Sequence, residues 1–381
     1  MDYKNIFKTC REPQLYGRYI TLGHIEPLLR QQQIGSLEVI GMSVQQNPIY
    51  ALTVGTGATR ILMWSQMHGN ESTATKALFD LIRFLRCDDV VAQKIFENCT
   101  LCIIPMLNPD GAALYTRENA AGTDLNRDFS SYSQPESRCL KAIFDDFTPN
   151  YCYNLHDQRT IFGVGDTGKP ATISFLAPSF DENRHWNEHR TDAATVIIAM
   201  NRVLQQFIPG QVGRFDDAFN NNCAGDTFQM KGVPTILIEA GHFQHDYERE
   251  VTREYFFTSM LAGLIANCEN VVVTSGIAEY LNIPQNKAVF YDFVYKNVKI
   301  NDDGKEIITN FAAQFKETLI GDKVAFEAVI IAVGNLERLG HFEYDANQAP
   351  YSDVSGSDPK IDSRADFYIG NQKFLNGAPV G

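Results

Sequence analysis

The sequence RILMWSQMHGNESTATKALFDLIRFLR, residues 60–86, passes from the pattern of a strand to that of a helix within a few positions. Residues 60–67 are mainly apolar and are bounded by turn residues, which is typical of a buried strand. From residue 71 onward, apolar side chains recur every three or four positions, which predicts an amphipathic helix over 71–86. A strand that leads directly into a helix is the repeating step of an α/β fold, so this stretch decides the fold class.

The same alternation continues on both sides of this stretch. Further strands are predicted at 37–44, 49–55, 100–106, 151–155 and 235–238, and further helices at 135–147, 181–207 and 247–268. These segments together predict an α/β domain with a mainly buried sheet.

The pattern changes after residue 270. Strand-like runs at 287–300, 323–335 and 365–374 follow one another, and turns rich in Asp and Gly separate them. A chain of 381 residues with 44% hydrophobic residues is long enough for two domains. We therefore predict a catalytic domain over residues 1–271 and a smaller β-rich domain over 272–381.

Charge and hydropathy exclude two classes of partner. The chain has 33 Lys and Arg against 46 Asp and Glu, a net charge of −13, which would repel a phosphate backbone and excludes nucleic acid as a partner. No apolar run approaches the roughly 20 residues that span a bilayer, and the first residues lack a signal-peptide pattern. We expect a cytoplasmic protein with no membrane partner.

The eight cysteines form no regular framework, which is expected for reduced thiols in a reducing compartment. Cys99 and Cys102 make a C-x-x-C pair within a predicted strand. Residues three apart on a strand point to opposite faces, so these two are expected to be buried thiols and not a metal or redox pair.

His68 and Glu71 lie at the junction of strand 60–67 and helix 71–86, where ligand sites of α/β sheets collect. A zinc hydrolase commonly uses two His and one Glu, with the fourth position open for water. His156 stands at the end of another predicted strand, 151–155, and is the natural third ligand.

Polar groups gather between these segments. The stretches 108–111 and 124–128 and the side chain of Arg117 do not resemble core elements. Arg117 and Arg127 suit an anionic substrate group and a polarised carbonyl, although a solvated loop with surface ion pairs is the alternative. Glu239 follows the apolar strand 235–238, where a carboxylate needs either an ion-pair partner or a chemical role.

In this order, the motifs resemble the M14 zinc carboxypeptidase family over roughly residues 35–268. The resemblance is carried by 68–71 (HGNE), 108–111 (NPDG) with Arg117, 124–127 (DLNR), 154–156 (NLH) and 238–240 (IEA). It implies a mixed twisted sheet flanked by helices. It also implies one zinc ion, held by His68, Glu71 and His156.

The resemblance assigns further roles in hydrolysis. Glu239 is implied as the general base and Arg117 as the group that polarises the scissile carbonyl. Asn126 and Arg127 are implied to hold a substrate carboxylate, and Asp124 to orient His68. The expected activity is that of a zinc metallocarboxypeptidase, which hydrolyses the amide bond next to a free carboxylate in a small peptide by metal-activated water.

Two alternatives stay open. The short insert before His156 and the β-rich domain are also similar to the aspartoacylase and succinylglutamate desuccinylase branch, which acts on N-acyl amino acids. Digestive carboxypeptidases carry a substrate-contacting tyrosine upstream of the base, whereas no tyrosine lies between His156 and Glu239 here. A catalytically inactive binding module is the third possibility.

Four other histidines could bind metal. His185 and His189 would share a face of the predicted helix 181–207, but they are expected to lie on a solvated or rim helix. His242 and His245 could form a rival metal cluster with Asp246, but the two histidines are expected to shape the pocket wall or to cap the helix that begins near 247.

Overall fold

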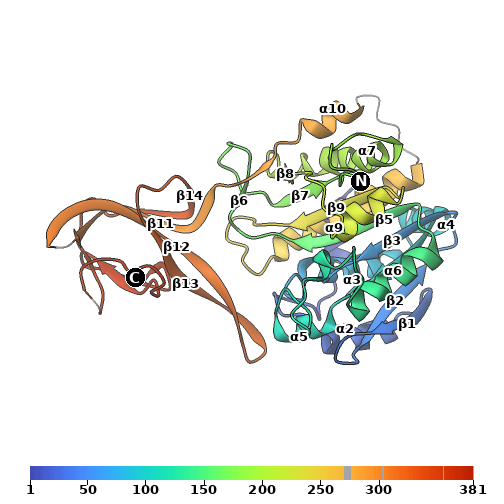
Figure 1. Ribbon diagram of the computed structural model, residues 1–381, viewed down its shortest axis with the longest axis horizontal. Coiled ribbons are helices and arrows are strands. Elements are labelled where there is room, and N and C mark those ends of the chain that lie inside the picture. Colours follow the sequence, from blue (N-terminus) through green and yellow to red (C-terminus); the bar gives the residue numbers. More distant parts are fainter. Residues whose placement is uncertain (270–275, 303, 355, 381) are drawn as a thin grey trace. The chain divides into compact units, whose positions relative to one another are not determined.

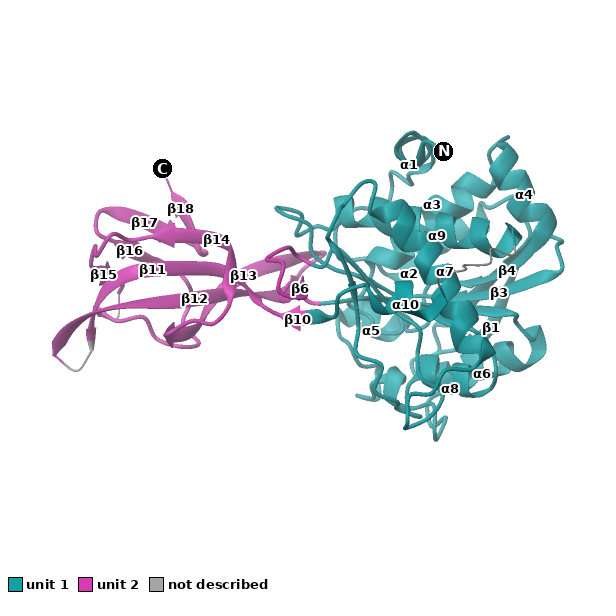
Figure 2. Cartoon of the chain, turned by 90° about the horizontal axis from the view of Figure 1, so that it is seen from above, with its two compact units in different colours: residues 1–158, 171–286 teal, residues 159–170, 287–381 magenta. Residues whose placement is uncertain are grey.

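The computed structural model describes residues 1–269, 276–302, 304–354 and 356–380. The chain forms two compact units: unit 1 comprises residues 1–158 and 171–286, and unit 2 comprises 159–170 and 287–381 (Figure 2). The predicted domain boundary at residues 271 and 272 lies outside the described residues. Residues 159–170, which follow the strand that carries His156, belong to unit 2.

Unit 1 is built on an eight-stranded sheet of order β1-β2-β4-β3-β5-β9-β7-β8. Its strands are β1 (Ser36–Met42), β2 (Pro48–Val54), β3 (Thr59–Trp64), β4 (Cys99–Ile104), β5 (Tyr151–Asp157), β7 (Ile173–Leu176), β8 (Val212–Arg214) and β9 (Thr235–Ala240). β3, β4, β5 and β9 are parallel, whereas β1, β2 and β7 each form antiparallel pairs. The sheet is mixed and helices flank it (Figure 1), so the predicted fold class is confirmed.

Helices pack on both faces of this sheet. Ile61 and Met63 of β3 join the apolar cluster that also contains side chains of α3 (Thr73–Leu85), α7 (Glu188–Leu204) and α9 (Glu250–Glu269). Leu62 and Trp64 point the other way and join the cluster of α6 (Pro135–Phe147) and α8 (Ala224–Met230), where the Trp64 ring lies 5.5 Å from that of Phe228. Because successive side chains of a strand point to opposite faces and both faces are covered here, residues 61–64 of β3 are all apolar.

Four of the described helices of unit 1, α3, α6, α7 and α9, correspond to the predicted ones, and the other six were not predicted. The described helices are α1 (Tyr3–Cys10), α2 (Leu22–Arg30), α3 (Thr73–Leu85), α4 (Val90–Asn98), α5 (Pro109–Leu114), α6 (Pro135–Phe147), α7 (Glu188–Leu204), α8 (Ala224–Met230), α9 (Glu250–Glu269) and α10 (Gly276–Leu281). α7 begins later than predicted because the side chain of Asn187 accepts a hydrogen bond from the backbone N–H of Arg190 at 2.9 Å and caps the helix there. None of the described helices combines the length and apolar character needed to cross a membrane.

Unit 2 is formed mainly of strands, and the predicted β-rich character of the C-terminal region is confirmed. One four-stranded sheet has the order β13-β12-β11-β14 and a second the order β15-β16-β17-β18. The strands are β11 (Phe290–Asp302), β12 (Lys305–Ile320), β13 (Lys323–Gly334), β14 (Leu339–Asp345), β15 (Tyr351–Ser352), β16 (Phe367–Ile369), β17 (Gln372–Leu375) and β18 (Ala378–Val380), with the short pair β6 (Phe162–Val164) and β10 (Asn286–Ala288). Aromatic side chains fill the core, for example Tyr295, whose ring lies 4.5 Å from that of Phe311.

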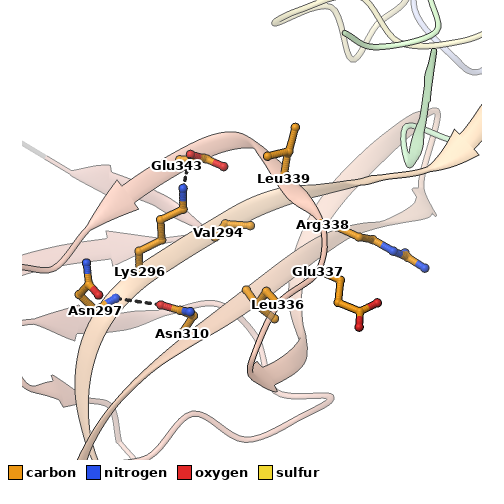
Figure 3. A pocket seen from close by; sticks show the side chains of 9 residues that line it. All are labelled: Val294, Lys296, Asn297, Asn310, Leu336, Glu337, Arg338, Leu339 and Glu343. Atoms are coloured by element: carbon orange, nitrogen blue, oxygen red, sulfur yellow. Dashed lines mark hydrogen bonds and ion pairs between the residues drawn. The ribbon is translucent and has the colours of Figure 1, made fainter. Parts of the chain in front are cut away.

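An open cavity of about 300 Å³ lies on unit 2 (Figure 3). Its lining includes the ion pair of Lys296 and Glu343, whose charged atoms are 2.6 Å apart, together with Glu337 and Arg338. Two cations and two carboxylates face it, so the lining offers a ligand no single sign of charge.

Candidate metal centre

The three predicted metal ligands lie together at the carboxyl ends of neighbouring strands. Nδ1 of His68 is 2.8 Å from Oε1 of Glu71, and Nδ1 of His156 is 2.9 Å from Oε2 of the same carboxylate. Their ligand atoms all lie within 4.8 Å of one another, and the residues are only 2–8% exposed. Among the described residues this is the one group of three or more such side chains that could hold a metal ion.

A tight turn after β3 brings His68 and Glu71 together. The backbone N–H of Glu71 donates to the carbonyl of His68 at 3.1 Å, which closes the turn just before α3. A Cβ atom on Gly69 would lie 2.0 Å from the carbonyl carbon of Gly111, so only glycine fits between the two backbones. His156 joins them because β5 pairs in parallel with β3.

The donor set fits a zinc ion. Two imidazole nitrogens and one carboxylate are the three-ligand set of catalytic zinc sites that keep a fourth position open. Burial lowers the pKa of His156 and favours the neutral ring that a metal requires. Burial alone would raise the pKa of Glu71, but His68 and His156 hold it well below its usual value, so the carboxylate is ionised.

Asp124 lies on the opposite side of the His68 ring. Its Oδ1 atom is 3.1 Å from Nε2 of His68, and its Oδ2 atom accepts from Nε of Arg117 at 3.0 Å. Burial opposes ionisation of Asp124, but His68 and Arg117 outweigh it and lower the pKa. The carboxylate can therefore hold the proton of His68 on Nε2 and leave Nδ1 with a lone pair for a metal.

Arg117 reaches the same centre from the polar loop. Its Nη1 atom lies 3.2 Å from Nδ1 of His68 and 3.3 Å from Oε1 of Glu71, and its side chain is half exposed. A guanidinium that is both beside the ligands and open to solvent can meet a substrate oxygen there.

Asn126 and Arg127 contact the start of α8. Oδ1 of Asn126 accepts from the backbone N–H of Ala224 at 2.9 Å, and Nη1 of Arg127 lies 3.1 Å from Sγ of Cys223. Both hydrogen bonds that Arg127 makes to described residues come from Nη1. Nε and Nη2 are thus available for a carboxylate.

Glu239 stands beside His156 in the sheet. The register of β5 and β9 pairs these two residues, which brings the carboxylate to the same strand ends. Its Oε2 atom is buried and has no hydrogen-bond partner among the described residues. Burial and the charges of Glu71 and Asp157 raise the pKa of Glu239 well above its usual value.

Comparison with known proteins shows what part of this chain is similar to. Residues 27–152 match the family described as zinc carboxypeptidase. The chain is related to the zinc carboxypeptidases. The resemblance that the motifs predicted is confirmed, and a zinc carboxypeptidase uses one metal ion of the kind that the buried group fits.

Similar proteins include carboxypeptidases of a plant and a mouse and a bacterial metallo-carboxypeptidase. The chain is 31% identical to Carboxypeptidase SOL1 of Arabidopsis thaliana over 38% of its own length and 34% of that protein, and 25% identical to Cytosolic carboxypeptidase 2 of Mus musculus over 42% and 20%. A metallo-carboxypeptidase from Pseudomonas aeruginosa, solved in complex with (2-guanidinoethylmercapto)succinic acid, has the same fold with a TM-score of 0.51 at 18% identity, over 65% of this chain and 70% of that one. The chain spans about a fifth to a third of the curated relatives it matches.

Two charged residues of this centre were not predicted from the sequence. Asp157 donates its backbone N–H to Oε2 of Glu71 at 3.1 Å, and its Oδ2 atom lies 3.3 Å from Nη1 of Arg249. Arg249 also donates to the carbonyl of Ala240 at 2.6 Å and to that of Gln158. It thus ties together the ends of β5 and β9. The position of Asp157 directly after His156 was a usable signal, whereas nothing local marks Arg249.

Among the described residues, the other histidines are not part of the group that could hold a metal ion. His185 precedes α7 and pairs with Asp181 at 2.8 Å, so it does not share a helical face with His189. The ring of the buried His242 lies 4.8 Å from that of Tyr247. The cap of α9 comes from Asp246, whose carboxylate accepts from the backbone N–H groups of residues 250 and 252 at 2.8 Å each.

Proposed function

We propose that the protein is a zinc-dependent metallocarboxypeptidase that hydrolyses the amide bond next to a free carboxylate in a small peptide. The observation that carries this proposal is the buried Oε2 atom of Glu239, which has no hydrogen-bond partner among the described residues and lies beside His156. A buried carboxylate oxygen without a partner is costly, and its retention next to a metal-binding group supports a proton-transfer role.

Each residue has a distinct task in this mechanism. His68, Glu71 and His156 would hold the zinc ion, which supplies a Lewis acid and lowers the pKa of water toward about 7. Glu239 takes the proton of the attacking water and later returns it to the leaving nitrogen, because its pKa is raised toward that of the water. Asp124 keeps His68 in the tautomer that binds metal.

The two arginines act on the substrate. Arg117 lies beside the metal ligands and would stabilise the negative charge that develops on the carbonyl oxygen. Arg127, with Asn126, would hold the terminal carboxylate, since a guanidinium can pair with it through two parallel hydrogen bonds. The succinic acid derivative bound to the Pseudomonas aeruginosa relative supports a small carboxylate ligand.

Replacement of Glu239 tests the proposal. The variant Glu239→Gln should lower kcat by at least about 100-fold, the usual contribution of general acid–base catalysis, and should keep its zinc. The matched control is Glu254→Gln, which alters another partly buried glutamate on α9 and should keep full activity. Full activity in Glu239→Gln, or purified protein that holds no divalent metal, would contradict the proposal.

Replacement of Arg127 tests how substrate is bound. Arg127→Ala should weaken binding of a free-acid peptide by about 2 kcal/mol or more and should leave binding of the corresponding peptide amide unchanged. Arg138→Ala is the control, because Arg138 is an exposed arginine nearby that donates to the carbonyls of Tyr132 and Ser133. Equal affinity of the unmutated protein for the acid and the amide would remove the role given to Arg127.

The runner-up activity is the deacylation of N-acyl amino acids. It is favoured by the β-rich unit 2 and by the absence of tyrosine between His156 and Glu239. Hydrolysis rates measured for a panel of dipeptides and for N-acetyl and N-succinyl amino acids separate the two activities. An inactive binding module would hydrolyse neither set.

A cytoplasmic location is also part of the proposal. It is supported by the similarity to a mouse protein named cytosolic carboxypeptidase 2. Cell fractionation with an antibody against this chain tests it, and recovery outside the cytoplasmic fraction would contradict it.

A further inference from the structure

Two cysteines far apart in the sequence meet at the edge of unit 1. Cys10 is the last residue of α1, Cys87 lies just beyond α3, and their Sγ atoms are 3.8 Å apart although 77 positions separate them. Both are thiols in the structure. A disulfide needs its sulfur atoms about 2.0 Å apart, so the two sulfur atoms must approach each other before a bond can form.

The backbone holds these thiols together independently of the sulfur atoms. Nε of Arg83 on α3 donates to the carbonyl of Cys10 at 3.0 Å. Phe7 of α1 and Phe84 of α3 both pack on Phe257 of α9, with ring centroids 5.7 and 6.3 Å apart respectively. The meeting of Cys10 and Cys87 is therefore fixed by the packing of three helices.

The pair also opens to solvent through a basic cavity. A cavity of about 210 Å³ is lined by Thr9, Cys10, Arg83, Arg86 and Cys87. Arg83 is 3.3 Å from a carboxylate oxygen of Glu12, but Arg86 donates to the neutral side chain of Gln32 at 3.2 Å, so its charge stays available to an anion. Cys87 is partly exposed, whereas Cys10 is 3% exposed.

We propose that Cys10 and Cys87 form a dithiol site that reacts with small anionic disulfides of the glutathione type and closes into an internal disulfide. Cys87, the more exposed of the two thiols, makes the first attack, and the thiolate is the nucleophilic form of any cysteine. Burial and the neighbouring Cys87 raise the pKa of Cys10 to about 12, so Cys10 remains a thiol during the first step. Cys10 then acts as the resolving group.

The chemistry balances with one molecule of the small disulfide. Cys87 loses its proton and attacks one sulfur atom, the S–S bond of the small molecule breaks, and the first thiolate leaves and takes up a proton. Cys10 then loses its proton and attacks the sulfur of Cys87, which releases the second small thiol. Two protein thiols are oxidised, and one disulfide is reduced to two thiols.

The test uses the full chain, reduced and then freed of reductant. After exposure to oxidised glutathione, the chain is denatured in acid, alkylated and mapped by mass spectrometry. We expect a peptide pair linked through residues 10 and 87. The variant Cys10→Ser should instead keep one glutathione on Cys87, because the resolving thiol is missing, and Cys87→Ser should form neither product.

A second pair of cysteines provides the control. Cys99 is buried at the start of β4, as predicted. Its Sγ atom lies 3.3 Å from Sγ of Cys268. Cys268→Ser should leave the link between residues 10 and 87 unchanged. Free alkylation of Cys10 and Cys87 after oxidation, or no adduct in Cys10→Ser, would overturn the proposal.

Arg86 tests the recognition of charge. Arg86→Gln should slow the reaction with oxidised glutathione by about threefold or more and leave the rate with neutral hydroxyethyl disulfide unchanged. Equal slowing with both reagents, or none with either, would remove the anionic preference. The readouts are masses and rates of thiol oxidation, so they do not depend on peptidase activity.

Discussion

Nε2 of His68 lies 3.1 Å from Oδ1 of Asp124, while Nδ1 of the same ring lies 2.8 Å from Glu71. The ring is thus held at both nitrogens, one by a carboxylate of the loop and the other within the proposed ligand group. Asp124 is itself fixed, since Oδ1 also accepts from the backbone N–H of Asn126 at 2.9 Å. The orientation of His68 is set before a metal binds.

The first prediction is that Asp124→Asn weakens metal binding. An amide can still accept a hydrogen bond, but it lacks the charge that favours a proton on Nε2, so affinity should fall by about 10- to 100-fold. Competition with a chelator of known affinity measures this. Asp128→Asn is the control, because that carboxylate bonds Ser133 and Gln134 instead, and an equal loss in both variants would refute the role of Asp124.

The second prediction concerns the arginine that ties the ends of β5 and β9. Lysine at position 249 keeps the charge but cannot reach Asp157 and the two carbonyls together, so His156 and Glu239 should lose their relative alignment. Arg249→Lys should lower kcat by about 10- to 100-fold and leave KM nearly unchanged.

The control for Arg249 is Arg253, a second buried arginine that lies four positions later, on α9. Arg253 pairs with Asp80 at 2.6 Å, away from the metal ligands, and it is fully buried. Arg253→Lys should lower the melting temperature and retain kcat. If Arg253→Lys lost as much kcat as Arg249→Lys for the same loss of stability, the kcat loss in Arg249→Lys would reflect stability alone. That result would contradict the role of Arg249 in alignment.

The part of the fold that sequence predicts well is local. α3 and α6 follow apolar periodicity, and α6 also has Pro135 in its first turn, where a missing N–H has no effect. The strand order is not local, because pairing between β5 and β9 joins residues far apart in the chain. For the same reason, no pattern marks residues 159–170 as part of unit 2.

The residues of the site also divide into those that local sequence predicts and those that it does not. His68, His156 and Glu239 could be chosen because each ends or follows an apolar strand, and parallel strands place such ends together. Arg249 could not be chosen, since it has a φ of 58° that arginine rarely adopts and its partners include backbone carbonyls, which leave no trace in sequence. Residue identity alone does not report either feature.

The third prediction is that Asp226 makes stability depend on pH. Burial raises its pKa to about 6, against about 3.9 for an unfolded aspartate. Between these two pKa values the folded chain binds a proton that the unfolded chain does not. The contribution of Asp226 to the free energy of unfolding therefore falls as pH rises from about 4 to about 6, by up to roughly 3 kcal/mol. Asp226→Asn removes this penalty.

Denaturant unfolding of both proteins at several pH values measures the effect. The free energy of unfolding of Asp226→Asn, minus that of the unmutated protein, should increase from pH 4 to pH 7. The exposed Asp216→Asn should show a nearly flat difference. A flat difference for Asp226→Asn as well would show that Asp226 titrates normally in the folded chain.

The fourth prediction compares the stability of metal-free and zinc-loaded protein. Burial alone would lower the pKa of His68, but Glu71 and Asp124 outweigh it and raise the pKa above 6.5 in the metal-free chain. The stabilisation from protonated His68 is therefore complete below the pKa of the unfolded chain and is lost as pH rises through the pKa of the folded chain. Zinc needs the unprotonated ring, so the affinity for zinc rises over the same pH interval. Each tenfold gain in affinity adds about 1.4 kcal/mol to the free energy of unfolding when zinc is in excess.

Melting temperatures of the zinc-loaded and metal-free protein measure this effect. The difference between the two should increase from pH 6 to pH 8, and His68→Ala should abolish the increase. A difference that stays constant with pH in the unmutated protein would mean that His68 is not a ligand.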